Sequence, residues 1–463
     1  MKNHHRSICL FPLAVCFLLA SLSGLAQAPV PTNSVPPPDF AAKVDEYVAA
    51  QIKINQFSGA VLLAKDGTVL LSKGYGLANR EFDLPNTPQT KFRLGSITKQ
   101  FTAAAILLLE ERGKLSTDDP IGKHLDQCPE VWKPITIHHL LTHTSGIPSY
   151  TDSPDYRRKM AFPTSTAEMV ARFRDQPLEF PVGDRFKYSN SGYFLLGAII
   201  EKAAGQSYEA FLRASIFEPL GMKDSGYDRF ETILPRRATG YAIRKGVLEN
   251  SAYLDMGQPY AAGSLYSTTE DLFRWERALA ARQLLSAASY EKMYTPCKGD
   301  YAYGWSVATR FRRKVISHGG GINGFSTMIS RYPDDEVCVI VLSNLQSANA
   351  GRISRDLEAL LFGEKYETPR ERVIAKIDPA IYDAYVGKYE LSPTFVLTVT
   401  RDGDRLLTQA TNQPQVEVFP ESETKFFLRA VDAQISFGKD QTGVITHLVL
   451  HQGGRDQTAK KVK

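Results

Sequence analysis

The order of strand-like and helix-like segments along this chain restricts its fold more than any other feature. Two apolar runs, Ser58–Lys65 and Thr68–Tyr75, flank Asp66-Gly67, which is a strong signal for a β-hairpin. Helical patterns and loops rich in Pro and Gly dominate from about residue 115 to 295. Strand patterns then return at Tyr303–Ala308, Lys314–Ser317, Phe325–Arg331 and Val337–Leu342. This order predicts an α+β fold in which both ends of the domain meet in one antiparallel sheet, flanked by helices and carrying an inserted helical lobe.

The C-terminal part follows a different pattern. A helix is expected at Gly351–Leu361, and the charged segment 364–375, with Pro369 inside it, is the expected linker. Residues 376–463 alternate as strands do, with a turn at Asp402-Gly403 and no helical period. A length of 463 residues suits two to three compact units. We therefore expect a main domain at 39–363 and a small all-β domain at 376–463.

The N-terminus has the pattern of a cleaved export signal. Lys2 and Arg6 precede an apolar run from Ile8 to Leu19, and small residues follow up to Ala28. Residues 1–28 are the expected signal peptide, although cleavage after Ala26 is an alternative. A retained membrane anchor is less favoured, because the run is shorter than the roughly 20 residues that a membrane-spanning helix needs. A lipid anchor on Cys16 is weaker still, because a bulky Val15 precedes it.

The segments after the signal suit an exported protein. Residues 29–38 contain five prolines and are the expected tether. No later segment has the apolar length of a membrane helix, so we expect no stable membrane span after signal cleavage and a periplasmic or secreted location. Loss of Lys2 and Arg6 lowers the formal net charge of +5 by two, and the remaining basic residues are scattered. A nucleic-acid partner is therefore not expected.

Three cysteines remain after the signal, too few and too widely spaced for a disulfide framework. Cys338 lies within an apolar strand pattern and is expected to be a core residue. A single Cys128–Cys297 bridge remains an alternative.

The first chemical signal is Ser96-Ile97-Thr98-Lys99 at the start of an apolar helix pattern. Residues three apart on a helix share a face, so Lys99 can reach the Ser96 hydroxyl. A lysine among apolar residues has a lowered pKa and can accept the proton of a nucleophilic serine. Three other Ser-x-x-Lys sequences begin at Ser289, Ser422 and Ser436, but they lack a helix start and are interpreted as surface residues.

The second signal is Tyr188-Ser189-Asn190, which precedes the apolar helix pattern Phe194–Ala204. In extended backbone, residues two apart face the same side. Tyr188 is then expected to carry a proton between Ser96 and a leaving group, and Asn190 to hold a substrate amide. The structural alternative is a core tyrosine followed by a helix cap.

The third signal is His318-Gly319-Gly320-Gly321, expected directly after the strand Lys314–Ser317. Glycines at a sheet edge let a substrate backbone approach the strand closely. We expect the N–H groups of Ser96 and Gly321 to form an oxyanion hole. His318 is expected to donate a hydrogen bond, charged or neutral, to a substrate carboxylate or to the Tyr188 oxygen. A turn histidine is the structural alternative.

In this order the three motifs resemble those of serine β-lactamases and penicillin-binding proteins, in particular the branch of class C β-lactamases, D,D-carboxypeptidases and esterases. The resemblance extends from about Gly59 to Asn344, through the segments 91–95, 137–146, 262–267 and 303–305. It implies a β-lactamase/transpeptidase-like fold and a serine hydrolase that works through an acyl-enzyme on Ser96, without a cofactor or metal. The implied substrates are esters, β-lactams or D-amino-acid peptides. The all-β tail looks like appendages found in this family.

One departure from the family pattern concerns the third motif. Many members that process β-lactams have Lys where this chain has His318, which weakens the expectation of carboxylate recognition. A glutamate of the class A type that would promote deacylation is not identifiable, so deacylation is expected to use Tyr188 and Lys99.

Two other functions compete with this interpretation. His138, His139 and His143 suggest a metal site, but no HExxH pattern or matched acidic ligand accompanies them. A non-catalytic penicillin-binding sensor or peptidoglycan-binding module has no chemical need for Ser96 and Lys99 together with Tyr188 and Asn190.

Overall fold

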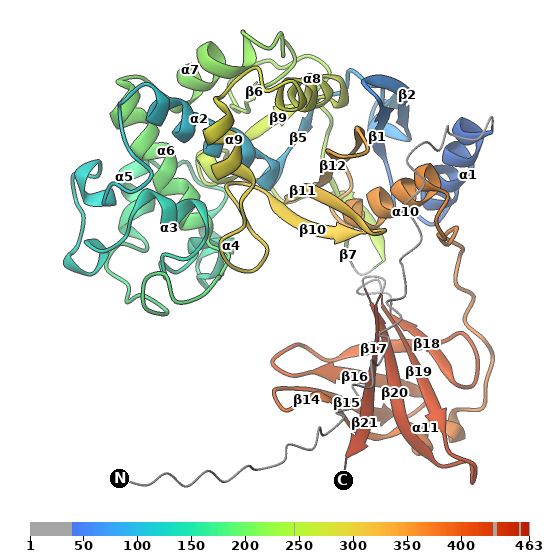
Figure 1. The fold of residues 1–463 in the computed structure, drawn as a ribbon. Helices are drawn as coiled ribbons and strands as arrows, with labels where there is room; N and C mark the ends of the chain where they lie inside the picture. The colour runs from blue at the N-terminus through green and yellow to red at the C-terminus, as the bar shows by residue number, and fades with distance from the viewer. Residues whose placement is uncertain (1–38, 245, 429–432, 453–454, 463) are drawn as a thin grey trace, which may run out of the picture. The chain divides into compact units, whose positions relative to one another are not determined.

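The computed structural model describes residues 39–244, 246–428, 433–452 and 455–462 (Figure 1). The expected signal peptide, 1–28, and tether, 29–38, lie outside these ranges.

A six-stranded antiparallel sheet forms the centre of the main domain, in the order β10-β11-β12-β13-β1-β2. Its strands are β1 (Gly59–Lys65), β2 (Thr68–Tyr75), β10 (Ser306–Arg310), β11 (Arg313–Ile322), β12 (Phe325–Tyr332) and β13 (Val337–Ser343). The predicted hairpin is confirmed, and Asp66 and Gly67 both have positive φ, 49° and 73°, as a two-residue hairpin turn of the primed type requires. β1 pairs with β13 from Gly59 opposite Ser343 onward, so early and late segments share one sheet as predicted.

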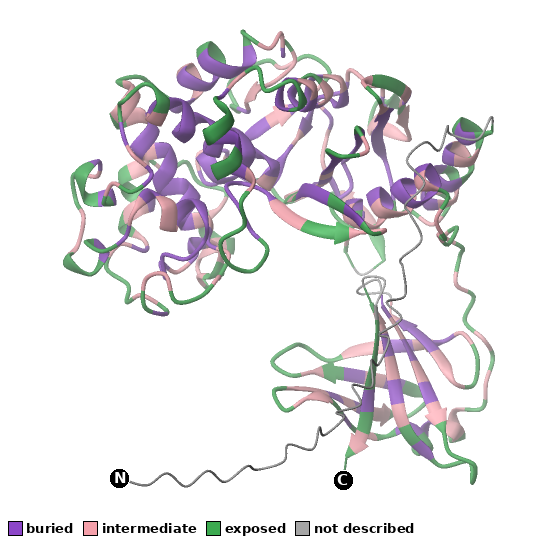
Figure 2. Cartoon of the chain, viewed as in Figure 1, coloured by how far each residue is buried: buried purple, intermediate pink, exposed green. Residues whose placement is uncertain are grey.

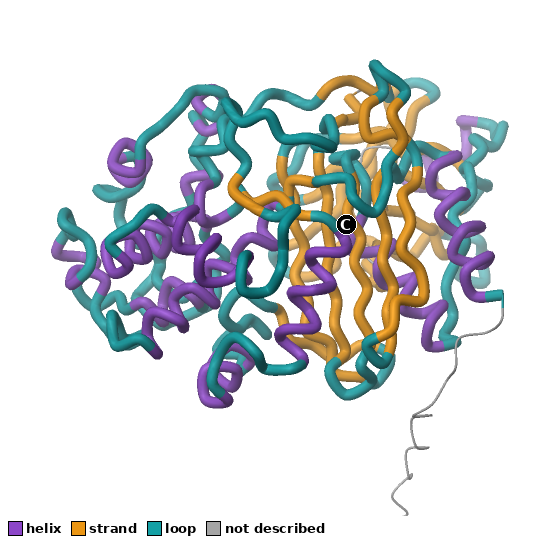
Figure 3. Tube along the Cα trace, turned by 90° about the horizontal axis from the view of Figure 1, so that it is seen from above, coloured by secondary structure: helices purple, strands orange, loops and turns teal. Residues whose placement is uncertain are grey.

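Helices cover both faces of this sheet. α1 (Phe40–Lys53) and α10 (Ala350–Phe362) lie on one side, whereas α2 (Thr98–Glu111) and α8 (Thr269–Ala280) lie on the other (Figures 1 and 3). The side chains of β1 alternate between the two cores because successive residues of a strand point to opposite faces. Strands buried on both faces are near-continuously apolar, and most of the central sheet is buried accordingly (Figure 2).

The predicted helical lobe lies between β2 and β10 in the sequence. Its helices, besides α2 and α8, are α3 (Ile137–Leu141), α4 (Tyr156–Lys159), α5 (Thr166–Ala171), α6 (Asn190–Ala204), α7 (Tyr208–Leu212) and α9 (Ala287–Tyr294). Seven short strands accompany them: β3 (Leu77–Asn79), β4 (Leu84–Pro85), β5 (Phe92–Arg93), β6 (Gly226–Tyr227), β7 (Tyr241–Arg244), β8 (Val247–Asn250) and β9 (Leu265–Ser267). The sequence did not predict these strands, because two to four residues are too few to display an alternating pattern.

Three predicted boundaries near the motifs were wrong. β11 does not end at Ser317 but continues through the glycines to Ile322, because His318–Ile322 pair with β12 in regular register. The helix expected from Phe194 starts at Asn190, so Asn190 is its first residue and follows the extended Ser189. The strand expected at Tyr303–Ala308 is instead β10, which starts at Ser306.

The C-terminal part is a closed eight-stranded barrel. Its strands are β14 (Gly387–Ser392), β15 (Phe395–Asp402), β16 (Arg405–Ala410), β17 (Val416–Pro420), β18 (Lys425–Leu428), β19 (Ala433–Lys439), β20 (Ile445–Gln452) and β21 (Arg455–Val462). The all-β prediction is confirmed, with one exception: a short helix, α11 (Tyr382–Tyr385), precedes the barrel and adds two buried tyrosines to its core. Four residues are too few to produce a helical period.

Candidate active site

Ser96 lies in a tight turn between a buried strand and a buried helix. β5 ends at Arg93, the 3₁₀ turn Gly95–Ile97 follows, and α2 begins at Thr98. Gly95 has φ of +55°, a conformation that residues with a side chain rarely adopt. A Cβ atom at Gly95 would also lie only 3.0 Å from the backbone nitrogen of Gly321. The glycine therefore turns the chain so that Ser96 faces the glycine-rich end of β11.

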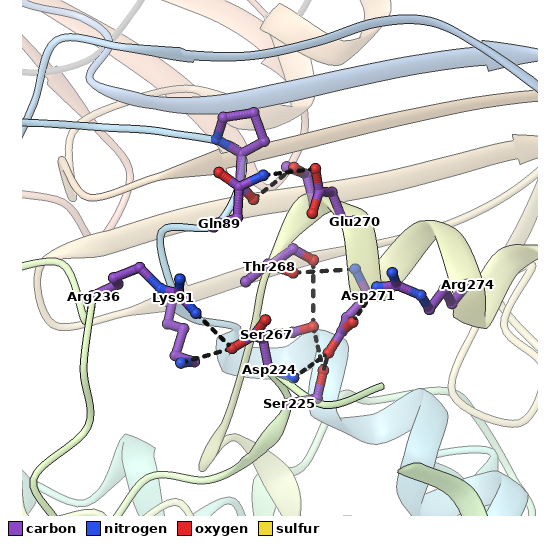
Figure 4. A network of polar contacts seen from close by, with 12 residues as sticks. Gln89, Lys91, Asp224, Ser225, Arg236, Ser267, Thr268, Glu270, Asp271 and Arg274 are labelled. Carbon is purple, nitrogen blue, oxygen red and sulfur yellow. Dashed lines mark hydrogen bonds and ion pairs between the residues drawn. The ribbon is translucent and has the colours of Figure 1, made fainter. Parts of the chain in front are cut away.

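A polar network braces the chain just before β5. Lys91 and Arg236 both contact the carboxylate of Asp224, at 2.8 and 3.2 Å (Figure 4). The backbone N–H of Asp224 donates to Asp271 in the first turn of α8. The strand that leads to Ser96 is thus tied to α8, which packs on the central sheet.

Lys99 is fully buried, and its amine contacts three oxygen atoms. Nζ lies 3.1 Å from Ser96 Oγ, 2.9 Å from Asn190 Oδ1 and 2.8 Å from the carbonyl oxygen of Ala262. Among the described residues, no carboxylate forms a hydrogen bond with Lys99. Burial lowers the pKa of Lys99 well below its ordinary value. A neutral amine has two N–H bonds and one lone pair. In the neutral form, Asn190 Oδ1 and the Ala262 oxygen accept the two N–H bonds, which leaves the lone pair for the Ser96 hydroxyl.

Tyr188 lies beside the same amine. Nζ of Lys99 is 4.8 Å from the centre of the Tyr188 ring. Burial raises the pKa of Tyr188, and a hydrogen bond with Ser96 opposes that rise. Tyr188 is therefore a neutral phenol at physiological pH. When the lone pair of Lys99 accepts a hydrogen bond from the Ser96 hydroxyl, the Tyr188 phenol can donate a hydrogen bond to Ser96 Oγ.

Asn190 is occupied on both ends of its amide. Its Oδ1 accepts from Lys99, and its Nδ2 donates to Thr151 Oγ1 at 3.1 Å. In this structure the side chain orients Lys99, and since Nδ2 has a second N–H, the predicted contact of Asn190 with a substrate amide stays a prediction. Asn190 reaches Lys99 from the first turn of α6, not from extended backbone.

His318 is locked into one neutral tautomer. Its Nδ1 lies 2.6 Å from the carbonyl oxygen of Gly319, which can only accept, so Nδ1 carries the proton. Its Nε2 lies 2.8 Å from the hydroxyl of Tyr301 and accepts from it. Burial, and secondarily the charge of Lys99, lowers the pKa of His318 to about 4. Both ring nitrogens are thus engaged, and the charged form that the sequence left open is disfavoured.

The three glycines differ in what surrounds them. β10 pairs with β11 only as far as Ser317, so the strand edge beyond that residue is not covered by β10. A Cβ atom at Gly320 would lie 1.9 Å from the carbonyl oxygen of Leu94, whereas one at Gly321 would meet nothing within 4 Å. Gly320 therefore permits β11 to pass directly against the backbone that precedes Ser96.

The structure thus brings together Ser96, Lys99, Tyr188, Asn190 and His318 with the glycine strand. Tyr301 and His143, which also contact this cluster, were not predicted to belong to it. Tyr301 lies in a loop before β10, and no spacing in the sequence distinguishes it from the neighbouring Tyr303. His143 stood out in the sequence only as one of three clustered histidines.

The metal alternative finds no support in the arrangement of those histidines. Nδ1 of His138 lies 2.6 Å from the hydroxyl of Tyr303, whereas Nδ1 of His139 caps the start of α3. Within the described ranges, no group of three or more His, Cys, Asp or Glu side chains is arranged to hold a metal ion. The Cys128–Cys297 bridge is not formed either, because the cysteines of the described residues are free thiols.

No helix among the described residues combines the length and apolar character that crossing a bilayer requires. The segment for which a membrane anchor was considered lies outside those residues.

Comparison with known proteins gives two family matches. Residues 40–364 match the family model described as Beta-lactamase, and residues 371–461 match a domain of unknown function, DUF3471. Penicillin-binding protein 4* of Bacillus subtilis is 34% identical over 448 residues, which cover 88% of this chain and 96% of that protein.

Solved structures of similar proteins agree with the match to the β-lactamase family. The octameric penicillin-binding protein homologue from Pyrococcus abyssi is 30% identical with a TM-score of 0.66, and the match covers 91% of this chain and all of that one. A D-stereospecific amidohydrolase from Streptomyces sp. is 26% identical with a TM-score of 0.60, and the match covers 71% of this chain and all of that one.

Proposed function

This chain belongs to the β-lactamase family, and on that premise we propose that it is an exported serine hydrolase that cleaves ester or amide bonds through an acyl-enzyme on Ser96. The observation that carries the proposal is the position of Lys99. Its buried amine lies 3.1 Å from Ser96 Oγ, and burial lowers its pKa, so its neutral form is placed to accept the hydroxyl proton.

In the acylation step, Lys99 accepts the hydroxyl proton as Ser96 Oγ attacks the substrate carbonyl. The negative charge moves to the carbonyl oxygen, which the N–H groups of Ser96 and Gly321 stabilise. Tyr188 donates its phenolic proton to the leaving group as the bond to it breaks, and recovers a proton from Lys99. The products are a free alcohol or amine and an ester on Ser96.

In the deacylation step, water attacks that ester. Tyr188 and Lys99 are the groups proposed to accept its proton, because the sequence offers no identifiable glutamate of the class A type. The proton returns to Ser96 Oγ when the acyl group leaves, which regenerates the enzyme.

The state of His318 supports substrates without a free carboxylate next to the scissile bond. A carboxylate needs a hydrogen-bond donor, but the single proton of His318 is held by the Gly319 carbonyl and its Nε2 accepts from Tyr301. Esters and amides of D-amino acids are therefore the preferred class, in line with the similarity to a D-stereospecific amidohydrolase. β-Lactams and D-Ala-D-Ala peptides, which carry such a carboxylate, are expected to be poorer substrates.

A substrate panel tests this assignment. The mature protein and Ser96→Ala are incubated with a p-nitrophenyl ester, nitrocefin and a D-Ala-D-Ala peptide, and turnover is measured. We expect the ester to be cleaved most readily and Ser96→Ala to lose all turnover. Retained turnover in Ser96→Ala would end the assignment.

The alternative is a non-catalytic sensor or peptidoglycan-binding module. Stable labelling of Ser96 by a penicillin or a fluorophosphonate, without hydrolysis of any ester or amide, would favour it. The buried amine beside Ser96, whose pKa is lowered by burial, argues against this alternative, because binding alone does not need a base.

The proposal includes a periplasmic or secreted location after removal of residues 1–28, and a division into a hydrolase domain (39–363), a linker (364–375) and a C-terminal domain (376–463). The proposed linker contacts folded elements near both of its ends. Tyr366 packs on Tyr47 of α1, and the N–H of Ala375 donates to Pro420 in the barrel. N-terminal sequencing of the exported protein tests the cleavage site.

A further inference from the structure

His143 is a buried histidine that the proposed reaction does not use. It follows α3 by two residues and is 1% exposed. Its φ of 56° is in the left-handed region, which is uncommon for a residue with a side chain. Backbone strain of this kind persists only where the surrounding structure enforces it, and it is enriched at functional sites.

The contacts of His143 converge on one residue of the site, Tyr188. The N–H of Lys187 donates to the carbonyl oxygen of His143 at 3.0 Å. The N–H of Ser189 donates to Nδ1 of His143 at 3.2 Å. The backbone is therefore held on both sides of Tyr188 by the same histidine. The imidazole also packs against the phenol ring, with centroids 4.3 Å apart and planes inclined by 37°.

These contacts fix the tautomer of His143. Because Nδ1 accepts from a backbone N–H, the single proton of the neutral ring is on Nε2. Burial is the main cause that lowers the pKa of His143 well below its ordinary value, and any positive charge on the nearby Lys99 or His318 lowers it further. Nε2 has no hydrogen-bond partner among the described residues and is enclosed by aromatic rings. An unpartnered buried polar atom is costly, so the position is not explained by stability.

We infer that His143 is a positioning residue that holds the Tyr188 phenol between Ser96 Oγ and the leaving group. This inference rests on the proposed function, in which Tyr188 protonates the leaving group. His143 acts through the backbone of residues 187 and 189 and through ring packing, and does not itself exchange a proton with the substrate.

The inference has a specific kinetic consequence. A phenol displaced by about 1 Å slows proton transfer by up to about 100-fold. Proton transfer matters most for a poor leaving group such as an alkoxide, and least for p-nitrophenolate, which departs without protonation. Loss of His143 should therefore slow alkyl ester hydrolysis selectively, whereas general damage to the fold slows both esters alike.

Two variants separate the hydrogen bond from the rest of the side chain. His143→Asn keeps an acceptor near the position of Nδ1, and His143→Gly removes it; both residues tolerate a left-handed φ. We measure kcat and KM for an ethyl ester and a p-nitrophenyl ester of the same D-amino acid, with thermal unfolding as a check on folding.

The expected result is a fall in kcat/KM, which reports the acylation step, of about 10- to 100-fold for the ethyl ester in His143→Gly, with less than about fivefold loss for the p-nitrophenyl ester. His143→Asn should recover most of the loss. In a Tyr188→Phe background, His143→Gly should add less than about twofold, because residues that act through one group are not additive.

Equal losses on both esters, a full additional loss in the Tyr188→Phe background, or no recovery by His143→Asn would overturn the inference. Failure of the proposed function gives a different pattern, namely turnover in Ser96→Ala or an undiminished ethyl ester rate in Tyr188→Phe.

Discussion

The hydroxyl of Tyr301 lies 2.8 Å from Nε2 of His318 and donates its proton to it. Since the other ring nitrogen donates to the Gly319 carbonyl, the imidazole has no donor left for a substrate. A neutral, fully engaged histidine at this place in the site is the basis for the first prediction.

The wild-type protein should prefer a carboxamide to the matching free acid. The test uses two substrates that differ only in this group beside the scissile bond, and compares their kcat/KM values. His318→Lys should raise the acid-to-amide ratio at least about tenfold, because a hydrogen bond to a charged group contributes about 1.5–3 kcal/mol. A wild-type preference for the free acid would refute the argument from His318.

The value of kcat/KM should rise with pH as Lys99 loses its proton, which gives the pH profile a rising part, here called the limb. The neutral amine is the active form, and burial lowers the pKa of Lys99 well below 10.5. The amine is protonated and inactive below this shifted pKa, so kcat/KM should increase with pH and level off before pH 10.5 is reached. Lys99→Met should show no limb because it is inactive.

His318 supplies the control for that profile. Its pKa is about 4, so His318 stays neutral above about pH 5. His318→Gln should therefore keep the shape of the profile above that pH, whatever its absolute rate. If the limb disappeared in this variant, the titrating group would be His318 and not Lys99.

Adding a methyl group to Gly320 should disrupt the site, whereas the same change at Gly321 should not disturb the fold. The new Cβ at 320 would lie 1.9 Å from the Leu94 carbonyl oxygen, which also accepts from Thr327. We expect Gly320→Ala to lower the free energy of unfolding by about 1–3 kcal/mol through overpacking and to reduce kcat.

Gly321→Ala is the matched control, because its Cβ meets nothing within 4 Å. Its free energy of unfolding should change by less than about 0.5 kcal/mol, as for other uncrowded surface changes. Urea unfolding of both variants provides the measurement. Equal stability of the two would contradict the close approach of β11 to Leu94.

Asp228 should matter for both stability and activity. Its buried carboxylate accepts from Arg93 at 2.6 Å and from Arg237 at 2.7 Å, and Arg93 ends the strand that leads to Ser96. Asp228→Ala should lower the free energy of unfolding, measured in urea, by about 3–5 kcal/mol, because removing one partner leaves partly buried charges uncompensated. In contrast, Asp155→Ala removes only exposed pairs such as that with Arg158 and should leave the free energy of unfolding almost unchanged.

The elements that were predictable have local causes. The hairpin at Asp66-Gly67 could be predicted because two adjacent residues with positive φ need those residue types. The helix carrying Lys99 could be predicted from its apolar spacing. The extension of β11 through His318 to Ile322 could not, because glycine has low strand propensity and only the register with β12 keeps it extended. The same limit applies to β5 and β9, two short strands that depend on pairing with each other.

The sequence by itself determined the order of strands and helices, the pair Ser96 and Lys99 one turn apart, and the all-β character of the C-terminal part. These features depend on residue type and spacing along the chain. The tertiary structure decided the lowered pKa values of Lys99 and His318, the hydrogen bond from Ser189 N–H to His143 and the hydrogen bond between Tyr301 and His318. A proton's position depends on burial and on partners as far as 163 residues away in sequence, as for Lys99 and Ala262, and only folding brings these together.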